Sequence, residues 1–184
     1  MSETREAIIQ LGDQLLRKKG YNAFSYYDLS KELGIKNAAI HYHFPTKSDL
    51  IVAIINYHKE RFEHFKKDCL KKKVIDKISF FLDIYTRIQA EQKICLVGTL
   101  ATDWDTIDET SQKHLQEVAD DILYWLTSVL SEGLKNGELH FTELPKTKAL
   151  LIISNMLAAT QLARVTSSKN FTTIRSAILA GLKP

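Results

Sequence analysis

The segment from Asn37 to His43 gathers side chains that can form hydrogen bonds with nucleic acid. It contains an asparagine, two alanines, two histidines and a tyrosine, and no acid. Asparagine can bridge the edge of an adenine, and an alanine methyl can touch the methyl of a thymine. Tyrosine and histidine can bond phosphate oxygens. This composition is unusual for a merely solvated helix face, and it predicts a surface that reads DNA.

Two short helices are expected to position these side chains. Ser25 opens the first, with Asp28 three residues later as in a capping box, and Gly34 ends it. Asn37 is expected to cap the second helix, over 38–43. Two short helices joined by a tight turn with glycine form a helix-turn-helix. An ordinary three-helix packing unit would show the same spacing, but the exposed histidines and tyrosine favour the DNA-binding interpretation.

The predicted DNA contacts extend to both sides of this segment. Lys47 follows the turn and suits a phosphate contact, as do the residues that open the preceding helix. The full set of predicted DNA-binding residues is Ser25, Tyr26, Tyr27, Lys36, Asn37, Ala38, Ala39, His41, Tyr42, His43 and Lys47.

The whole chain is expected to be all-α, with about nine helices. Apolar residues recur at helical spacing, and no segment alternates with period two for long enough to predict a strand. After the fourth helix, which Thr46 caps, we expect helices at about 74–91 and 93–104, then from 108 or 110 to 133, and finally at 147–166 and 171–182. The predicted domains are a three-helix DNA-binding domain, 1–46, and a larger helical domain for effector binding and dimerisation, 47–184.

Composition narrows the class of protein. The 184 residues are 45% apolar with three prolines, which favours a well-packed core, and the net charge of +3 alone does not argue for nucleic acid. The first residues lack a basic start followed by an apolar run, so no secretory signal is expected. The apolar stretch from Ala149 is too short to span a bilayer. Cys69 and Cys95 lack a disulfide or zinc spacing. We therefore expect a cytoplasmic protein without a membrane partner.

The alternatives to a DNA-binding protein are an enzyme and a metal-binding protein. The chain has no Gly-x-Ser-x-Gly, no Gly-x-x-x-x-Gly-Lys and no His-Glu-x-x-His sequence. We therefore expect that the protein is not an enzyme and binds no cofactor. His41 and His43 lie two residues apart on a helix and cannot chelate one ion together. The acids from Asp103 to Glu109 lie between helices, where capping or a solvated loop is favoured over a cation site. No metal site is predicted.

The first quarter of the chain resembles the DNA-binding domain of the TetR/AcrR family of bacterial transcriptional regulators. The resemblance is carried by Thr4-Arg5-Glu6, Lys19-Gly20-Tyr21, Asp28-Leu29-Ser30, Leu33-Gly34-Ile35 and the run from Ala39 to Leu50. His41 stands where the family usually has tyrosine, and Lys36-Asn37 also departs from the common pattern. Base preference therefore does not carry over to this chain.

The resemblance implies a homodimer that binds a palindromic operator and represses. It also implies that a small molecule binds among the C-terminal helices and tilts the fourth helix. This tilt would move the two DNA-binding domains of the dimer apart. The alternative is a DNA-binding dimer without a ligand, which would have an architectural role or act with a protein partner. We expect dimer contacts through 147–166 and 171–182, at Leu150, Ile153, Leu157, Ile174 and Ile178. A largely apolar or aromatic effector is expected among Phe62, Phe65, Phe81, Tyr85, Leu96, Leu100, Trp104, Tyr124 and Trp125.

Overall fold

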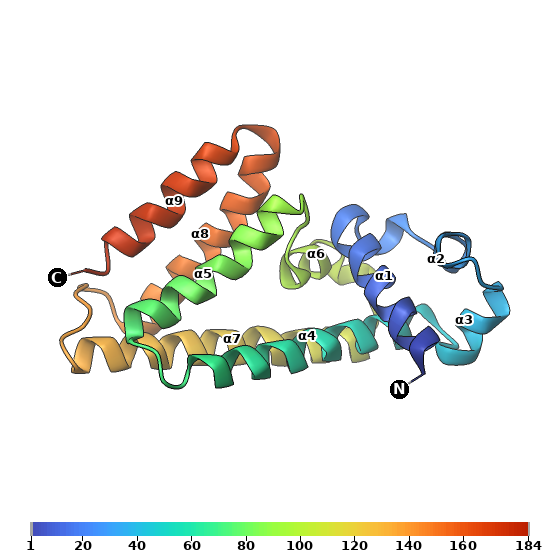
Figure 1. Ribbon diagram of the computed structural model, residues 1–184, viewed down its shortest axis with the longest axis horizontal. Coiled ribbons are helices and arrows are strands. Elements are labelled where there is room, and N and C mark those ends of the chain that lie inside the picture. Colours follow the sequence, from blue (N-terminus) through green and yellow to red (C-terminus); the bar gives the residue numbers. More distant parts are fainter. Residues whose placement is uncertain (1, 184) are drawn as a thin grey trace. The chain divides into compact units, whose positions relative to one another are not determined.

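The computed structural model describes residues 2–183, and every regular element in that range is helical. This confirms the predicted all-α fold with nine α-helices among the described residues (Figure 1). The elements are α1 (Glu3–Lys19), the 3-10 turn η1 (Tyr21–Ala23), α2 (Tyr26–Leu33), α3 (Asn37–His43), α4 (Lys47–Cys69), α5 (Val74–Ala90), α6 (Leu96–Thr102), the 3-10 turn η2 (Trp104–Thr106), α7 (Glu109–Lys135), α8 (Pro145–Val165) and α9 (Ser168–Ala180).

The chain forms two compact units, each built from two separate stretches. The first unit joins residues up to 65 with 96–118, and the second joins 66–95 with the chain from 119 onward. Helices α4 and α7 therefore have residues in both units. The functional division at residue 46 that we predicted from the sequence remains a prediction.

Some helix bounds differ from those expected. The helix predicted at 93–104 is α6, Leu96–Thr102, and residues 104–106 form a separate 3-10 turn. The last helix starts at Ser168, three residues before the predicted position. Ser167 explains the earlier start because its hydroxyl accepts a hydrogen bond from the backbone N–H of Lys169.

In the first unit, α1 packs against α2, α3 and α6. Ile8, Leu16, Leu29 and Ile40 are fully buried in the core of this unit. A Cβ added at Gly12 of α1 would lie 3.1 Å from Cδ1 of Ile54 on α4. The missing side chain thus lets α1 approach the first part of α4 closely.

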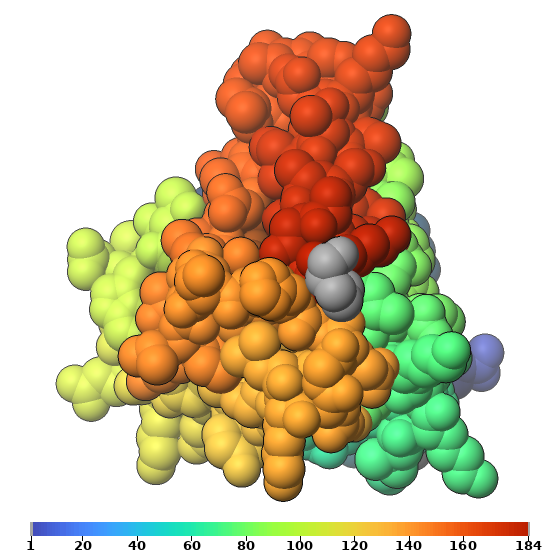
Figure 2. All heavy atoms as spheres, turned by 90° about the vertical axis from the view of Figure 1, so that its left-hand side faces the viewer, coloured from blue at the N-terminus to red at the C-terminus, as the bar shows by residue number. Residues whose placement is uncertain are grey.

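In the second unit, α5, α8 and α9 pack against one another, as Figure 1 shows. The sequence of α8 is apolar nearly all round, so we expected burial on every side. Within the single chain, however, α8 leaves Leu150, Leu151, Leu162 and Val165 exposed. Figure 2 shows the face of this unit formed by α9 and the last part of α8, in red and orange. Neither α8 nor any other described helix is long and apolar enough to cross a membrane.

Gly133 marks a tight contact in the second unit. A Cβ built there would lie 2.4 Å from Cδ1 of Leu139 and 2.8 Å from Cγ1 of Val74, and both of these side chains are buried. Replacing Gly133 by alanine should therefore destabilise the protein by about 1–3 kcal/mol, because overpacking exceeds the gain in helix propensity of about 1 kcal/mol. Urea unfolding measures this loss. Gly181→Ala is the matched control, since its nearest neighbour would lie at 3.4 Å; equal stability of the two variants would contradict the prediction.

Candidate nucleic-acid interface

The start of α2 is fixed by its capping box, as predicted. The backbone N–H of Ser25 donates to Oδ2 of Asp28 at 2.7 Å, and the N–H of Asp28 donates to the Ser25 hydroxyl oxygen at 3.4 Å. Hydrogen bonds from Ser25 also hold the pKa of the Asp28 carboxyl below its usual range. These bonds satisfy amides that would otherwise have no partner at the first turn of the helix.

The turn between α2 and α3 depends on Gly34. This residue has φ of 66°, in the left-handed region that favours glycine. The N–H groups of Gly34 and Ile35 both donate to the carbonyl of Ser30, which closes the end of α2. The prediction that Asn37 caps the next helix is wrong by one residue: Lys36 is the N-cap, because Asn37 already has helical backbone conformation.

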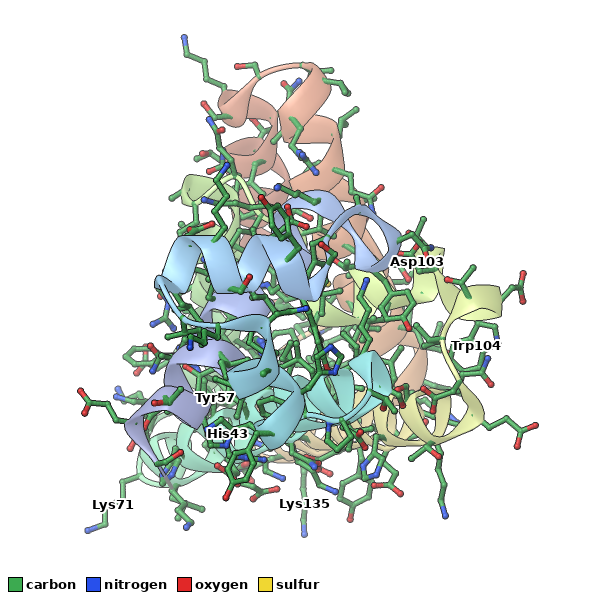
Figure 3. The ribbon with its side chains drawn as sticks, turned by 90° about the vertical axis from the view of Figure 1, so that its right-hand side faces the viewer. His43, Tyr57, Lys71, Asp103, Trp104 and Lys135 are labelled. Carbon is green, nitrogen blue, oxygen red and sulfur yellow. The ribbon has the colours of Figure 1, made fainter. Side chains whose placement is uncertain are left out.

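Helix α3 has one face in the core and one face in solvent. Ile40 is fully buried and pins the helix to the unit. Of the six predicted contact residues on α3, four are exposed and two are half-buried. The exposed ones are Asn37, Ala38, His41 and Tyr42, and the half-buried ones are Ala39 and His43. The Tyr42 side chain is 82% exposed. Figure 3 shows the side chains of this unit as sticks, with His43 of α3 labelled. The predicted reading residues are thus available to an external partner.

Tyr26, predicted to contact phosphate, lies inside the unit instead. Its side chain is buried, and its hydroxyl donates to the carbonyl of Phe44 at 2.9 Å and contacts the carbonyl of Thr46. Burial also raises the pKa of this tyrosine. The structure therefore gives Tyr26 a positioning role: it joins the first turn of α2 to the segment between α3 and α4.

Lys47 also faces the protein. Its ammonium group donates to the carbonyl of Phe24 at 2.6 Å and to the carbonyl of Tyr21, and it lies over both aromatic rings. Burial lowers the pKa of this lysine. A contact between Lys47 and a phosphate, as predicted, would require these two hydrogen bonds to be exchanged for bonds to DNA.

The remaining predicted contacts flank α3 at the surface. Tyr27 is 69% exposed, and Lys36 and Ser25 are exposed as well. The hydroxyl of Ser25 already donates to Asp28 in the capping box, at 2.6 Å. Tyr27 and Lys36 therefore extend the accessible polar surface of α3 on the α2 side.

Asp103 is a positioning residue that the sequence analysis missed. Its carboxylate accepts a hydrogen bond from the backbone N–H of Tyr21 at 2.8 Å and from the amide of Asn22 at 3.0 Å. Figure 3 shows Asp103 beside the η1 turn. The contact joins η2 to η1 within the first unit. No local sequence pattern could predict it, because the partners lie 81 and 82 residues apart.

A buried charged cluster connects α1 with α4. Oδ1 of Asp13 lies 2.6 Å from Nε2 of His58, and Oδ2 of Asp13 lies 3.3 Å from Nη1 of Arg17. Burial alone would raise the pKa of Asp13, but the hydrogen bonds and charges of His58 and Arg17 outweigh it and hold the pKa below its usual range. This cluster stabilises the packing of α1 against the first half of α4.

The nine residues predicted to line an effector pocket divide between the two units. In the second unit, Phe81 contacts Tyr85 and Trp125, with ring centroids 5.6 and 5.7 Å apart. Tyr124, in the same unit, is 75% exposed. The other five belong to the first unit, where Phe62 stacks on Phe65, Leu96 and Leu100 are buried, and Trp104 is exposed.

The predicted dimer residues lie on α8 and α9, which pack side by side. Leu150 is 47% exposed, and the other four residues are half-buried: Ile153, Leu157, Ile174 and Ile178.

The acidic segment before α7, from Asp103 to Glu109, has a capping function. The Asp108 carboxylate accepts hydrogen bonds from the backbone N–H and the hydroxyl of Ser111.

Comparison with known proteins shows which regulators this chain resembles. The family model for bacterial regulatory proteins of the tetR family matches residues 8–54. A TetR transcriptional regulator from Legionella pneumophila is 33% identical, with 100% of this chain and 99% of that chain covered and a TM-score of 0.88. An HTH-type transcriptional regulator in the lacX 3′ region of Lactococcus lactis subsp. lactis is 27% identical, over 92% of this chain and 88% of its own length.

A protein from Saccharomonospora viridis, described as a transcriptional regulator and crystallised in complex with choline, has the same fold. It is 16% identical, with all of both chains covered, and the TM-score is 0.80. Together with the helix-turn-helix geometry of α2 and α3, the family model and the Legionella pneumophila relative show that the chain belongs to the TetR family of DNA-binding transcriptional regulators.

Proposed function

We propose that the chain is a homodimeric repressor that binds a palindromic operator and leaves it when a small, largely apolar or aromatic effector binds. The observation that carries the proposal is the exposed, acid-free face of α3, which is held in place from its buried side. Two copies of this helix would read half-sites one helical turn apart, about 34–36 Å between centres. An effector would act by differential affinity for the DNA-bound and released arrangements.

The proposed dimer surface is the outer side of α8 and α9. The exposed leucines of α8 form an apolar surface that a single chain leaves in water, and burying it against a second copy would be favourable. A twofold arrangement would place the same helices of both copies in contact. The predicted interface residues Leu150, Ile153, Leu157, Ile174 and Ile178 lie on these two helices.

Leu150→Glu should convert the dimer to a monomer. A carboxylate at this position would be buried without a partner in the proposed interface, which costs several kcal/mol. Light scattering after size exclusion should show the mass of one chain, and operator affinity should fall at least about tenfold because half-sites would bind independently. Leu144→Glu is the control, since Leu144 is 75% exposed and precedes α8. A dimer that persists in Leu150→Glu, with unchanged affinity, would exclude this interface.

The effector part of the proposal is supported by the cluster of Phe81, Tyr85 and Trp125. Aromatic rings of this kind line many sites for apolar ligands. The choline complex of the Saccharomonospora viridis protein supports the view that this fold can hold a small molecule.

Repression is tested by selecting bound fragments from random duplexes and placing the selected operator over a reporter promoter. Expression of the chain should lower reporter output, and deletion should restore it. Screening apolar aromatic compounds by thermal shift should then identify one that stabilises the protein and releases the operator. An increase in reporter output on expression would show activation and contradict the proposal. A compound that raises stability without changing operator affinity would contradict its role as effector.

A further inference from the structure

A polar pocket in the second unit is lined by none of the predicted aromatic residues. Its volume is about 430 Å³, within the range of about 300–1,000 Å³ of small-molecule sites. Its lining residues come from the C-terminal end of α5 and from the segment where α8 ends and α9 begins. Figure 1 labels these three helices. The lining residues are Gln89, Gln92, Lys93, Thr160, Ala163, Arg164 and Ser168.

The lining is basic and rich in hydrogen-bonding groups. Lys93 and Arg164 contribute two positive charges, and no Asp or Glu is among the lining residues. Glu91 pairs with Lys93 at 2.7 Å from outside the lining set. No carboxylate of residues 2–183 forms an ion pair with Arg164. One of the two cations is therefore uncompensated, which favours an anion over a neutral or cationic ligand.

The backbone around the pocket reinforces this preference. Ser168 is the first residue of α9, a helix of 13 residues with no acid in its first turn. The positive end of its dipole therefore adds to the charge of Arg164 and Lys93. Gln92, one of the lining residues, has φ of 54°, a left-handed conformation that is rare outside glycine.

We propose that this pocket binds a small polar anion whose carboxylate or phosphate oxygens are held by Arg164 and Lys93. The planar guanidinium group of Arg164 matches two anionic oxygens at once, and the ammonium group of Lys93 adds a point charge. Gln89 and Gln92, which also line the pocket, carry side-chain amides that can bond hydroxyl groups of the same ligand. The site is distinct from the proposed aromatic effector site and takes a ligand of different polarity, so it does not depend on repression.

Calorimetric titration of the full chain, free of DNA, tests the proposal. The probes are malate, inorganic phosphate and choline. Malate or phosphate should bind saturably with a Kd in the millimolar range or tighter, and choline should not bind. A preference for malate would identify a carboxylate ligand, and a preference for phosphate would identify a phosphoryl ligand; both results support an anion site. Binding of choline alone, or of none of the three, would overturn the proposal.

Variants locate the bound anion. Arg164→Gln should weaken anion binding about tenfold or more, because a charge-assisted hydrogen bond is lost. Arg87→Gln removes an exposed cation from α5 outside the pocket and should leave the affinity unchanged. Lys93→Gln provides a second variant, and circular dichroism checks that each protein is folded. Amide chemical shifts of Gln92 and Ser168 should move with the anion. Equal affinities of Arg164→Gln and Arg87→Gln, or unmoved shifts, would overturn the assignment.

Discussion

Tyr42→Ala should weaken binding to the selected operator by roughly ten- to a hundredfold, which corresponds to about 1–3 kcal/mol. The side chain of Tyr42 is 82% exposed on the solvent face of α3, and its hydroxyl can donate to a phosphate oxygen. Because the ring contributes little to the core of the unit, the helix content and the unfolding temperature should not change. Gel-shift or fluorescence-anisotropy titration at fixed salt measures the loss.

Two further variants separate the possible causes of this loss. Tyr42→Phe keeps the ring and removes the hydroxyl, so it should lose most of the same affinity if the phosphate bond dominates. Tyr124→Ala removes an equally prominent tyrosine, 75% exposed on α7, and should bind the operator like the parent chain. Unaltered affinity in Tyr42→Ala would show that α3 is not the reading helix.

The fold was predictable because its signals are local. Helix starts and ends follow from capping residues such as Ser25 with Asp28, from Gly34, and from Pro145 at the first position of α8. The spacing of the apolar residues along each helix then identifies the face of that helix that is buried. The burial of α8 was not predictable in the same way, because an apolar sequence does not reveal whether a second helix of the chain or a second copy covers each side.

The accessible face of the candidate site was predictable, but the contacts of Tyr26 and Lys47 were not. The exposed residues of α3 follow from the position of Ile40, which must face the core. Tyr26 and Lys47 are amphipathic side chains that look alike in sequence whether they reach for phosphate or for a backbone carbonyl. Their partners, at Phe44 and Phe24, lie 18 and 23 residues away. Only the tertiary packing decides between the two orientations.

The cluster of Asp13, Arg17 and His58 leads to the largest expected effect on stability. Asp13→Ala should lower the free energy of unfolding by about 3 kcal/mol, because it leaves two polar or charged groups without their shared buried acceptor. For a chain of this length the midpoint of thermal unfolding should fall by roughly 6–12 °C. Glu60→Ala is the control, since Glu60 is an exposed acid on α4 and its removal should change stability by less than about 0.5 kcal/mol.

A double-mutant cycle tests whether the loss belongs to the contact between α1 and α4. Asp13→Ala, His58→Ala and the double variant are unfolded with urea at pH 7, and a coupling of about 1–3 kcal/mol is expected. Additive effects would contradict a direct interaction across the 2.6 Å contact.

The cluster also predicts how this stability depends on pH. The folded-state pKa of Asp13 is lowered below its usual 3.8, so its contribution is fully present above about pH 4 and is lost as pH falls through the lower folded value. The deficit of Asp13→Ala relative to the parent should therefore shrink as the pH falls below about 4, where the Asp13 carboxylate of the parent becomes protonated. A deficit that grows as the pH falls below about 4 would mean that Asp13 is held protonated in the folded protein, which would reverse the role assigned to His58 and Arg17.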